Sequence, residues 1–333
     1  MRKTIVLLTL LLLMIGSLLV AETFKFGVAL GWVVNDFGMA FKEEIEEQLN
    51  EIFPGCKIYF AEANYDPMKQ SSQIENFVNM RVDALFVTPA DPTAIVPALL
   101  KANKAGIPIF VADSFPNGVQ VKTIAMSNNF AMGYYQAIYI CQQLHGKGRI
   151  AAVNLPENSS WYERTVGLKM ALERYPGVKL IAEYDYVPGG IGVLTPKQAV
   201  KNMLTANPNP GDINAIWCSW DGAAVEAAEA IEETGRSNEG IIVTGIDGFE
   251  QSLDLIREGT PLKAVMAQSP REMARTLVKC ARRLFDGLPI PSIVITPVYQ
   301  FTEEKVPEQG LGPYGYDEED YIISNPQIMS RDL

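Results

Sequence analysis

Apolar runs that suit buried strands alternate with segments of helical periodicity along most of the chain. The first run, Phe24 to Leu30, is followed by Phe41, Ile45 and Leu49 at helical spacing. Later runs of the same character are separated by helix-length segments and cover residues 82–89, 107–113, 148–155, 179–186, 214–220, 241–247 and 263–268. Because these runs lack internal polar alternation, they predict parallel strands that helices cover on both faces.

The number of strand–helix units is too large for one comfortable open sheet. The chain has 333 residues, of which 48% are hydrophobic and 20% charged, as expected for a globular protein of two ordinary domains. The pattern therefore predicts an α/β fold with two doubly wound parallel sheets. A single (β/α)₈ barrel is the structural alternative.

Residues 1–21 have the layout of a secretory signal peptide. Arg2 and Lys3 precede an unbroken apolar run from Thr4 to Val20, and the small residue Ala21 stands at the expected cleavage point. An uncleaved membrane anchor is the alternative, although the run is near the lower length limit for a membrane span. No later segment has an apolar run of that length. We therefore expect an exported, soluble protein in the periplasm or an equivalent extracytoplasmic space.

The charge balance argues against nucleic acid as a partner. Removing the signal peptide lowers the formal charge from −11 to −13, because the basic residues Arg2 and Lys3 are lost. An acidic surface repels phosphate backbones.

Cysteine and histidine are too few and too scattered to predict a metal site. The chain has four cysteines: Cys56, Cys141, Cys218 and Cys280. All but Cys56 lie in apolar periodic segments, which favours buried thiols, although one long-range disulfide stays open as an alternative. His145 is the one histidine, and its place at a predicted helix end suits a C-cap better than a metal ligand. We predict no metal and no cofactor.

Catalytic motifs are equally scarce. The glycine-rich stretch "PGGIGV" (188–193) matches neither a dinucleotide fingerprint nor a P-loop, and no G-x-S-x-G elbow is present. A carbohydrate-active enzyme that uses carboxylates alone stays open, with Asp113 and Asp247 as the candidate pair.

Polar and aromatic side chains stand where the predicted strands end. In open parallel sheets, ligands bind beyond the carboxyl ends of the strands. Amides and carboxylates bind hydroxyl groups, and aromatic faces cover the C–H patches of a sugar ring. The strand ends supply Trp32, Asn35, Asp36, Phe37, Asp113, Ser114, Trp161, Arg164, Trp220, Asp221, Asp247 and Gln268.

Several of these residues also have a structural interpretation. Asp36 and Asp221 suit helix N-caps, and Asp247 before Gly248 suits a turn. Phe37 and Trp220 suit a hydrophobic core. The joint pattern across six strand ends favours a shared binding site, whereas Trp217 is expected to pack within its sheet.

Four stretches carry a family resemblance: "ANYDPMKQSSQIENFVNMRVDALFVTPADPTAIVPALLKANKAGIPIFVADS", "ERTVGLKMAL", "VTGIDGFEQSLDLIREG" and "AVMAQSPREMA". From about Phe24 to about Glu303, the chain resembles the periplasmic sugar-binding proteins of the ribose and galactose type, which feed ABC importers and share their core with the LacI-type repressors. No helix-turn-helix segment precedes the first strand, which argues against the repressor branch.

The resemblance implies the type I periplasmic binding protein fold, with two lobes on a three-segment hinge. We assign residues 22–126 plus 269–297 to the N-terminal lobe, 127–268 plus 298–305 to the C-terminal lobe, and 306–333 to a C-terminal extension. The resemblance implies ligand-binding roles for Asn35, Phe37, Asp113, Arg164, Asp247 and Gln268.

Two positions depart from the ribose receptors, which have arginine where this chain has Ser114 and asparagine where it has Trp220. Both are included among the predicted ligand-binding residues, and Trp220 predicts a more aromatic wall. Trp32 and Trp161 are further candidates for the same cleft.

The predicted function is capture of a neutral monosaccharide or polyol without chemistry. Closure of the two lobes around the ligand would present it to the membrane permease of an ABC transporter, and a monomeric protein is expected. A receptor for chemotaxis or sensing shares every sequence feature and is the first alternative, and a carbohydrate-active enzyme is the second.

Overall fold

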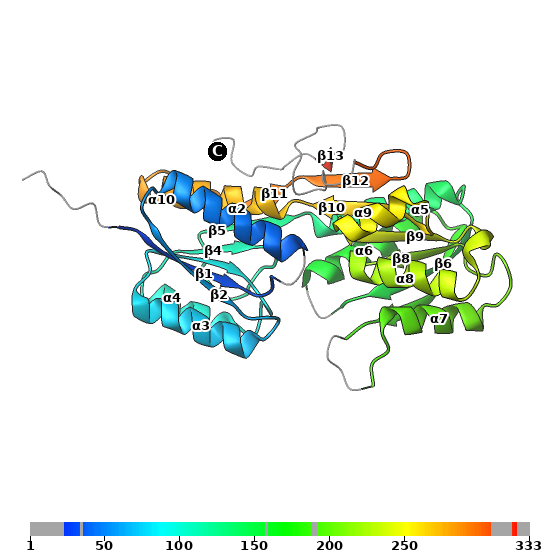
Figure 1. The fold of residues 1–333 in the computed structure, drawn as a ribbon, viewed down its shortest axis with the longest axis horizontal. Coiled ribbons are helices and arrows are strands. Elements are labelled where there is room, and N and C mark those ends of the chain that lie inside the picture. The colour runs from blue at the N-terminus through cyan, green and yellow to red at the C-terminus, as the bar shows by residue number, and fades with distance from the viewer. Residues whose placement is uncertain (1–22, 34–35, 157–158, 188–191, 308–321, 325–333) are drawn as a thin grey trace, which may run out of the picture.

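A computed structural model describes residues 23–33, 36–156, 159–187, 192–307 and 322–324. The predicted signal peptide, Asn35, most of the "PGGIGV" stretch and most of the C-terminal extension lie outside the described residues. The described chain forms two α/β lobes that lie side by side along the long axis of the molecule (Figure 1). In this part of the chain, no helix combines the length and the apolar character that a membrane crossing requires.

Within the described residues, the sheet of the N-terminal lobe has six strands, all parallel, in the order β11-β5-β4-β3-β1-β2. The strands are β1 (Lys25–Leu30), β2 (Lys57–Glu62), β3 (Ala84–Thr88), β4 (Ile109–Ala112), β5 (Thr123–Ser127) and β11 (Ile293–Thr296).

The described part of the C-terminal lobe forms a sheet of seven strands in the order β13-β12-β10-β9-β8-β6-β7. The last five in this order are parallel, whereas β12 pairs antiparallel with both β10 and β13. The strands are β6 (Gly148–Asn154), β7 (Val178–Asp185), β8 (Ala215–Cys218), β9 (Ile242–Asp247), β10 (Leu262–Gln268), β12 (Val298–Thr302) and β13 (Ile322–Ser324).

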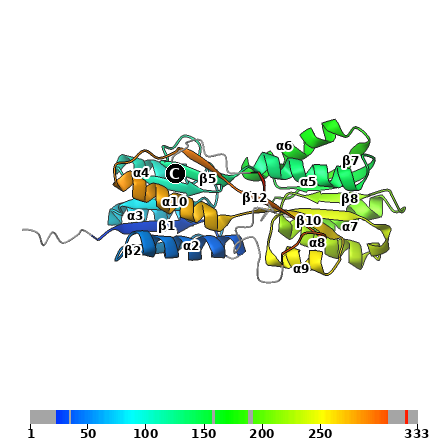
Figure 2. The same cartoon turned by 90° about the horizontal axis from the view of Figure 1, so that it is seen from above.

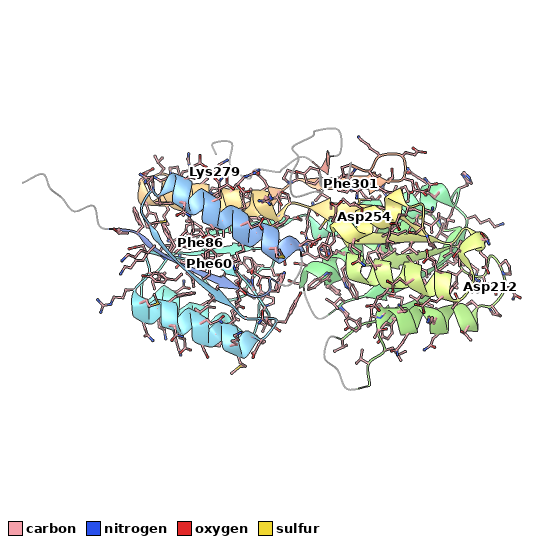
Figure 3. The ribbon with its side chains drawn as sticks, viewed as in Figure 1. Phe60, Phe86, Asp212, Asp254, Lys279 and Phe301 are labelled. Carbon is pink, nitrogen blue, oxygen red and sulfur yellow. The ribbon has the colours of Figure 1, made fainter. Side chains whose placement is uncertain are left out.

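Helices cover both faces of each sheet, so each lobe has an apolar core on either side of its strands. In the N-terminal lobe, one face carries α2 (Asp36–Ile52) and α10 (Pro270–Phe285), and the other carries α3 (Pro67–Met80) and α4 (Val96–Lys104). Figure 1 shows these two pairs above and below the strands. Figure 3 labels Phe86 in this lobe and Phe301 in the other, and both side chains are fully buried.

The C-terminal lobe is covered in the same way (Figure 2). One face packs against two helices, α5 (Asn129–Gln143) and α6 (Ser159–Arg174). The other packs against α7 (Pro196–Ala206), α8 (Asp221–Glu233) and α9 (Glu250–Arg257), with a short 3₁₀ helix η1 (Ser237–Glu239) after α8.

The chain crosses between the two sheets at three places: from β5 to α5, from β10 to α10 and from β11 to β12. At the second crossing, Ser269 accepts a hydrogen bond from Glu272 N and Pro270 occupies the first turn of α10, so strand and helix are joined without a loop. The predicted α/β fold with two parallel sheets on a three-segment hinge is confirmed, and the (β/α)₈ alternative is wrong. The residue boundaries assigned to the lobes from the sequence stay a prediction.

Candidate ligand-binding site

Two adjoining cavities lie where the carboxyl ends of the strands of both lobes meet. The smaller one, of about 50 Å³, is called the polar compartment because half of its lining residues are polar, the rest being aromatic; the polar residues are Asp113, Ser160, Arg164, Asp247 and Gln268. The larger one, of about 670 Å³, is called the aromatic compartment. Both share the walls made by Trp32, Tyr65, Trp161, Asp247 and Phe249.

An arginine at the centre of the polar compartment organises its C-terminal wall. Arg164 is almost fully buried on α6, and its guanidinium lies 3.0 Å from Asp247 Oδ1. Its other nitrogens donate to Asn129 Oδ1 at 2.9 Å and to the Ser219 carbonyl at 2.8 Å. Gln268 Nε2 donates to the same Asp247 Oδ1 at 2.8 Å. The carboxylate is therefore held from two sides through one oxygen, and its Oδ2 lies outside both of these bonds.

Asp113 supplies the carboxylate of the opposite wall. It follows β4 in the N-terminal lobe and accepts a 2.8 Å hydrogen bond at Oδ2 from the buried Ser114 hydroxyl. Ser160, at the start of α6 in the other lobe, donates to the Asp113 carbonyl at 3.2 Å. The two lobes also touch where Glu250 N donates to Asp36 Oδ2 at 3.2 Å. The walls of the site therefore lie close together across the cleft.

Both carboxylates stand on strained backbone. Asp113 has φ 72° and Asp247 has φ 133°, a region that residues other than glycine rarely adopt. Such strain costs on the order of 1–3 kcal/mol per residue and persists where a site requires it. The backbone thus supports a functional role for both residues, which the turn interpretation of Asp247 does not explain alone.

Burial governs the protonation of the carboxylates. It raises the pKa of Asp113, against the opposing effect of the Arg164 charge. Burial likewise raises the pKa of Asp247 to about 6, again opposed by Arg164. Burial and then the nearby charge of Asp247 raise the pKa of Tyr65. A site with two carboxylates and one guanidinium suits neutral ligands and disfavours anionic ones.

Asp221 has a structural role that the sequence did not reveal. Trp220 occupies the N-cap position of α8, so the N-cap interpretation of Asp221 is wrong. The fully buried Asp221 Oδ2 instead accepts hydrogen bonds from Gly248 N at 2.7 Å and Phe249 N at 2.8 Å. These bonds fix the turn that carries Asp247.

We expect the stability of the protein to fall with rising pH because of Asp221. Burial, followed by repulsion from Asp247, raises the pKa of Asp221 from 3.8 to about 7. Between these values the folded state holds a proton that the unfolded state has released, so the free energy of unfolding decreases as the pH rises through the folded-state pKa.

In Asp221→Asn this contribution is absent. The loss of unfolding free energy between pH 5 and pH 8, measured by urea denaturation, should be smaller than in the wild type by on the order of 2 kcal/mol. Parallel pH profiles of the two proteins would contradict the assignment.

Close backbone packing positions the helix that carries Arg164. A Cβ atom on Gly133 of α5 would lie 1.9 Å from the Arg164 carbonyl oxygen, and one on Gly167 of α6 would lie 2.2 Å from the Phe130 carbonyl oxygen. Only glycine permits such an approach, so these two residues set the spacing of α5 and α6.

Gly133→Ala is therefore expected to lower the melting temperature. Forcing the helices apart should cost roughly 1–3 kcal/mol or more, as overpacking does. Gln142→Ala on the exposed face of the same helix is the matched control and should change the stability by less than about 0.5 kcal/mol. Thermal unfolding followed by circular dichroism compares the two, and an unchanged Gly133→Ala transition would exclude tight packing here.

The aromatic compartment is walled by two pairs of stacked rings. Trp32 and Tyr65 of the N-terminal lobe lie with ring centroids 5.8 Å apart and an interplanar angle of 5°. Tyr186 and Trp220 of the C-terminal lobe lie 5.6 Å apart at 25°. Trp161, from α6, has the Arg164 guanidinium 5.8 Å from its ring centroid. Each lobe therefore offers flat apolar faces to the cleft.

The structure brings most of the predicted site residues together. Seven of them line the polar compartment: Trp32, Phe37, Asp113, Trp161, Arg164, Asp247 and Gln268. Trp220 lines the aromatic compartment and not the polar one. Ser114 lines neither compartment and acts behind Asp113, and Asn35 lies outside the described residues. Trp217 is fully buried in its lobe, as predicted.

Sequence reasoning missed Tyr65, Ser160, Tyr186 and Phe249, which also line the site. Tyr65 and Tyr186 follow the ends of β2 and β7. They would have been found if the expectation that ligands bind beyond the carboxyl ends of strands, called here the strand-end rule, had been applied to these two strands. Phe249 follows Gly248, and its ring was not distinguishable from a core side chain. Phe249 packs partly against the N-terminal core across the cleft.

Metal-binding clusters of histidine, cysteine and carboxylate side chains are absent from the described residues. All four cysteines are free thiols, and Cys141, Cys218 and Cys280 are buried, which confirms the prediction for these three residues.

Two parallel-sheet lobes on a three-segment hinge, with a polar site between them, define the class of bilobal ligand-binding proteins. The chain belongs to the family described as the periplasmic binding protein domain, which it matches over residues 26–289.

Similar proteins agree with this membership. The ribose import binding protein RbsB of Bacillus subtilis (strain 168) is 28% identical over 286 residues, which cover 85% of this chain and 88% of that protein. A crystal structure of an ABC sugar transporter subunit from Rhodobacter sphaeroides superimposes with a TM-score of 0.76 and 26% identity, covering 84% of this chain and 98% of that one. An ABC transporter solute binding protein from Bacillus halodurans with bound myo-inositol gives a TM-score of 0.75 and 25% identity, covering 85% and 95%.

Proposed function

We propose that the protein is an extracytoplasmic solute-binding protein that captures a neutral sugar or polyol and delivers it to an ABC transporter permease. The observation that carries the proposal is the convergence of polar groups from both lobes on one compartment, with Asp113 on one side and Arg164, Asp247 and Gln268 on the other. Relatives described as binding ribose and, in a solved structure, myo-inositol support a hydroxyl-rich ligand.

The hydrogen-bonding capacity of the polar compartment also supports a hydroxyl-rich ligand. Within the described residues, Trp161 Nε1 and Gln268 Oε1 are buried without a partner. One is a donor and the other an acceptor, and a sugar hydroxyl satisfies either. A buried polar atom left unpaired costs about 1–3 kcal/mol, so a ligand that pairs both atoms is favoured.

The proposed mechanism is closure of the lobes around the ligand. Asp113 stands on the N-terminal lobe, whereas Arg164 and Asp247 stand on the C-terminal lobe. A ligand that bonds to both walls has a higher affinity for the closed form, and therefore shifts the population towards closure. The permease would then recognise the closed arrangement of the two lobes.

Several finer assignments belong to this proposal. They are export by cleavage of residues 1–21, the lobe boundaries predicted from the sequence, a monomeric state and the absence of catalysis. A role in sensing uses the same ligand capture and differs in the partner protein alone.

The test is calorimetric titration of the mature protein, after denaturation and refolding to remove retained ligand. The panel consists of D-ribose, D-allose, D-xylose, D-glucose, D-galactose and myo-inositol. Micromolar or tighter binding of at least one compound, recovered unchanged afterwards, is expected. Conversion of the compound would show an enzyme instead, and failure of all sugars and their glycosides to bind would overturn the proposal.

A further inference from the structure

The cavity between the lobes offers more room than one sugar ring fills. The polar compartment, at about 50 Å³, is the small end of this space, and it opens along the shared walls into the larger compartment. A ring that directs its hydroxyls to the polar side chains lies against the shared walls, next to the aromatic compartment. That compartment, at about 670 Å³, falls in the range of roughly 300–1,000 Å³ that proteins use for ligands of drug size.

This volume is not the gap of two separated lobes. Ser160 of the C-terminal lobe already bonds to the Asp113 carbonyl, its hydroxyl lies 3.4 Å from that of Ser114, and Glu250 N bonds to Asp36. Space for a larger ligand thus remains while the lobes are in contact.

The part of the aromatic compartment beyond the shared walls is poor in hydrogen-bonding side chains. It is lined by Tyr186, Trp220, Pro67, Pro92, Leu155 and small residues, with Asp91 as the charged side chain. Asp91 Oδ1 already accepts from Thr93 N at 2.7 Å and Ala94 N at 2.8 Å. Flat apolar walls of this kind bind the faces of a ring better than a dense set of hydroxyls.

We propose that the ligand is a glycoside with two rings, an inference that rests on the proposed function. A sugar ring directs its hydroxyls into the polar compartment, and a second ring, joined through the glycosidic oxygen, lies by the stacked Tyr186 and Trp220. The second ring is either another sugar or an aromatic group, since both present an apolar face to an indole.

The test compares glycosides of the panel sugars that differ in the second ring alone. Methyl and phenyl glycosides of D-ribose, D-allose, D-xylose, D-glucose and D-galactose, in both anomeric forms, are titrated by calorimetry beside the free sugars. The expected result is at least one phenyl glycoside that binds tenfold or more tightly than its methyl counterpart. Cellobiose, lactose and xylobiose test a sugar as the second ring, and a tenfold gain over the free sugar is again expected if the natural second ring is a sugar.

Variants show which side chains produce the higher affinity for the phenyl glycoside. Tyr186→Ala and Trp220→Ala should each reduce the phenyl-to-methyl affinity ratio to within about twofold of one, because they remove the stacked pair. Tyr186→Phe keeps the ring and should keep the ratio. Tyr162→Ala, which removes an exposed aromatic side chain beside Trp161 that lines neither compartment, is the matched control and should also keep it.

The outcomes separate this inference from the proposed function. Tight binding of a free sugar without any gain from a second ring would overturn the two-ring ligand and leave sugar capture intact. A gain that survives both alanine variants would also overturn it, because the second ring would then lie elsewhere. If no sugar or glycoside binds, the proposed function fails and the two-ring ligand fails with it.

Discussion

Replacing Asp113 or Asp247 by alanine is expected to remove measurable sugar binding. Asp113→Ala should remain close to the wild type in stability, whereas Asp247→Ala should also be less stable, because it leaves the buried Arg164 charge without its partner. Each carboxylate stands in the polar compartment on its own lobe, and each has only one oxygen engaged by the hydrogen bonds described above. A hydrogen bond to a charged group contributes about 1.5–3 kcal/mol, so losing two from a ligand weakens affinity by roughly 10²–10⁴-fold.

Calorimetry with the best-binding panel sugar measures the loss, and thermal unfolding shows that each variant is folded. Asp254→Ala is the matched control, because it removes a partly exposed carboxylate of α9 that lines neither compartment (Figure 3). It should retain wild-type affinity. Unchanged affinity in Asp113→Ala or Asp247→Ala would place the ligand outside the polar compartment.

Arg164→Met is expected to produce the largest loss of stability. Arg164 is buried, and the substitution removes its contacts with Asp247, Asn129 and the Ser219 carbonyl together. Breaking a buried ion pair from one side costs about 3–5 kcal/mol, because the remaining charge is uncompensated. Thermal and urea unfolding measure the loss.

A double variant identifies the uncompensated charge as the cause. Arg164→Met combined with Asp247→Asn leaves no charge at either position, so part of the lost stability should return. Arg149→Met, which breaks the partly exposed pair with Asp212, should cost no more than about 1 kcal/mol. If the double variant is no more stable than Arg164→Met, the loss comes from packing or from the other two hydrogen bonds.

Most residues of the candidate site were expected from the carboxyl ends of the predicted strands, because the apolar pattern of the sequence is strong there. Asp113, Asp247 and Gln268 follow uninterrupted apolar runs, and parallel strands bring such ends to one edge of a sheet. Where the strand signal was weak, the strand-end rule was not applied. Strand β2, "KIYFAE", is partly exposed along its length, and the Tyr65 that follows it was missed.

The hydrophobic pattern of the sequence also could not predict which strands pair near the β11 edge of one sheet and the β12 edge of the other. The runs at β5, β11 and β12 are short and lie close to turns, and β12 runs antiparallel to β10. The pairing of β11 with β5 joins segments more than 100 residues apart, and that of β12 with β10 reaches across α10 and β11. Local periodicity carries no information about such partners.

The sequence by itself determined the class of fold, because each local run of apolar residues indicates a strand that is buried on both faces. It also determined which strand ends carry hydrogen-bonding chemistry. Only the tertiary structure decided how these ends are used. It placed Ser114 behind Asp113, assigned Asp221 to the turn that supports Asp247, and stacked Tyr186 on Trp220. These roles depend on distances between residues remote in sequence, and folding of the whole chain is what sets those distances.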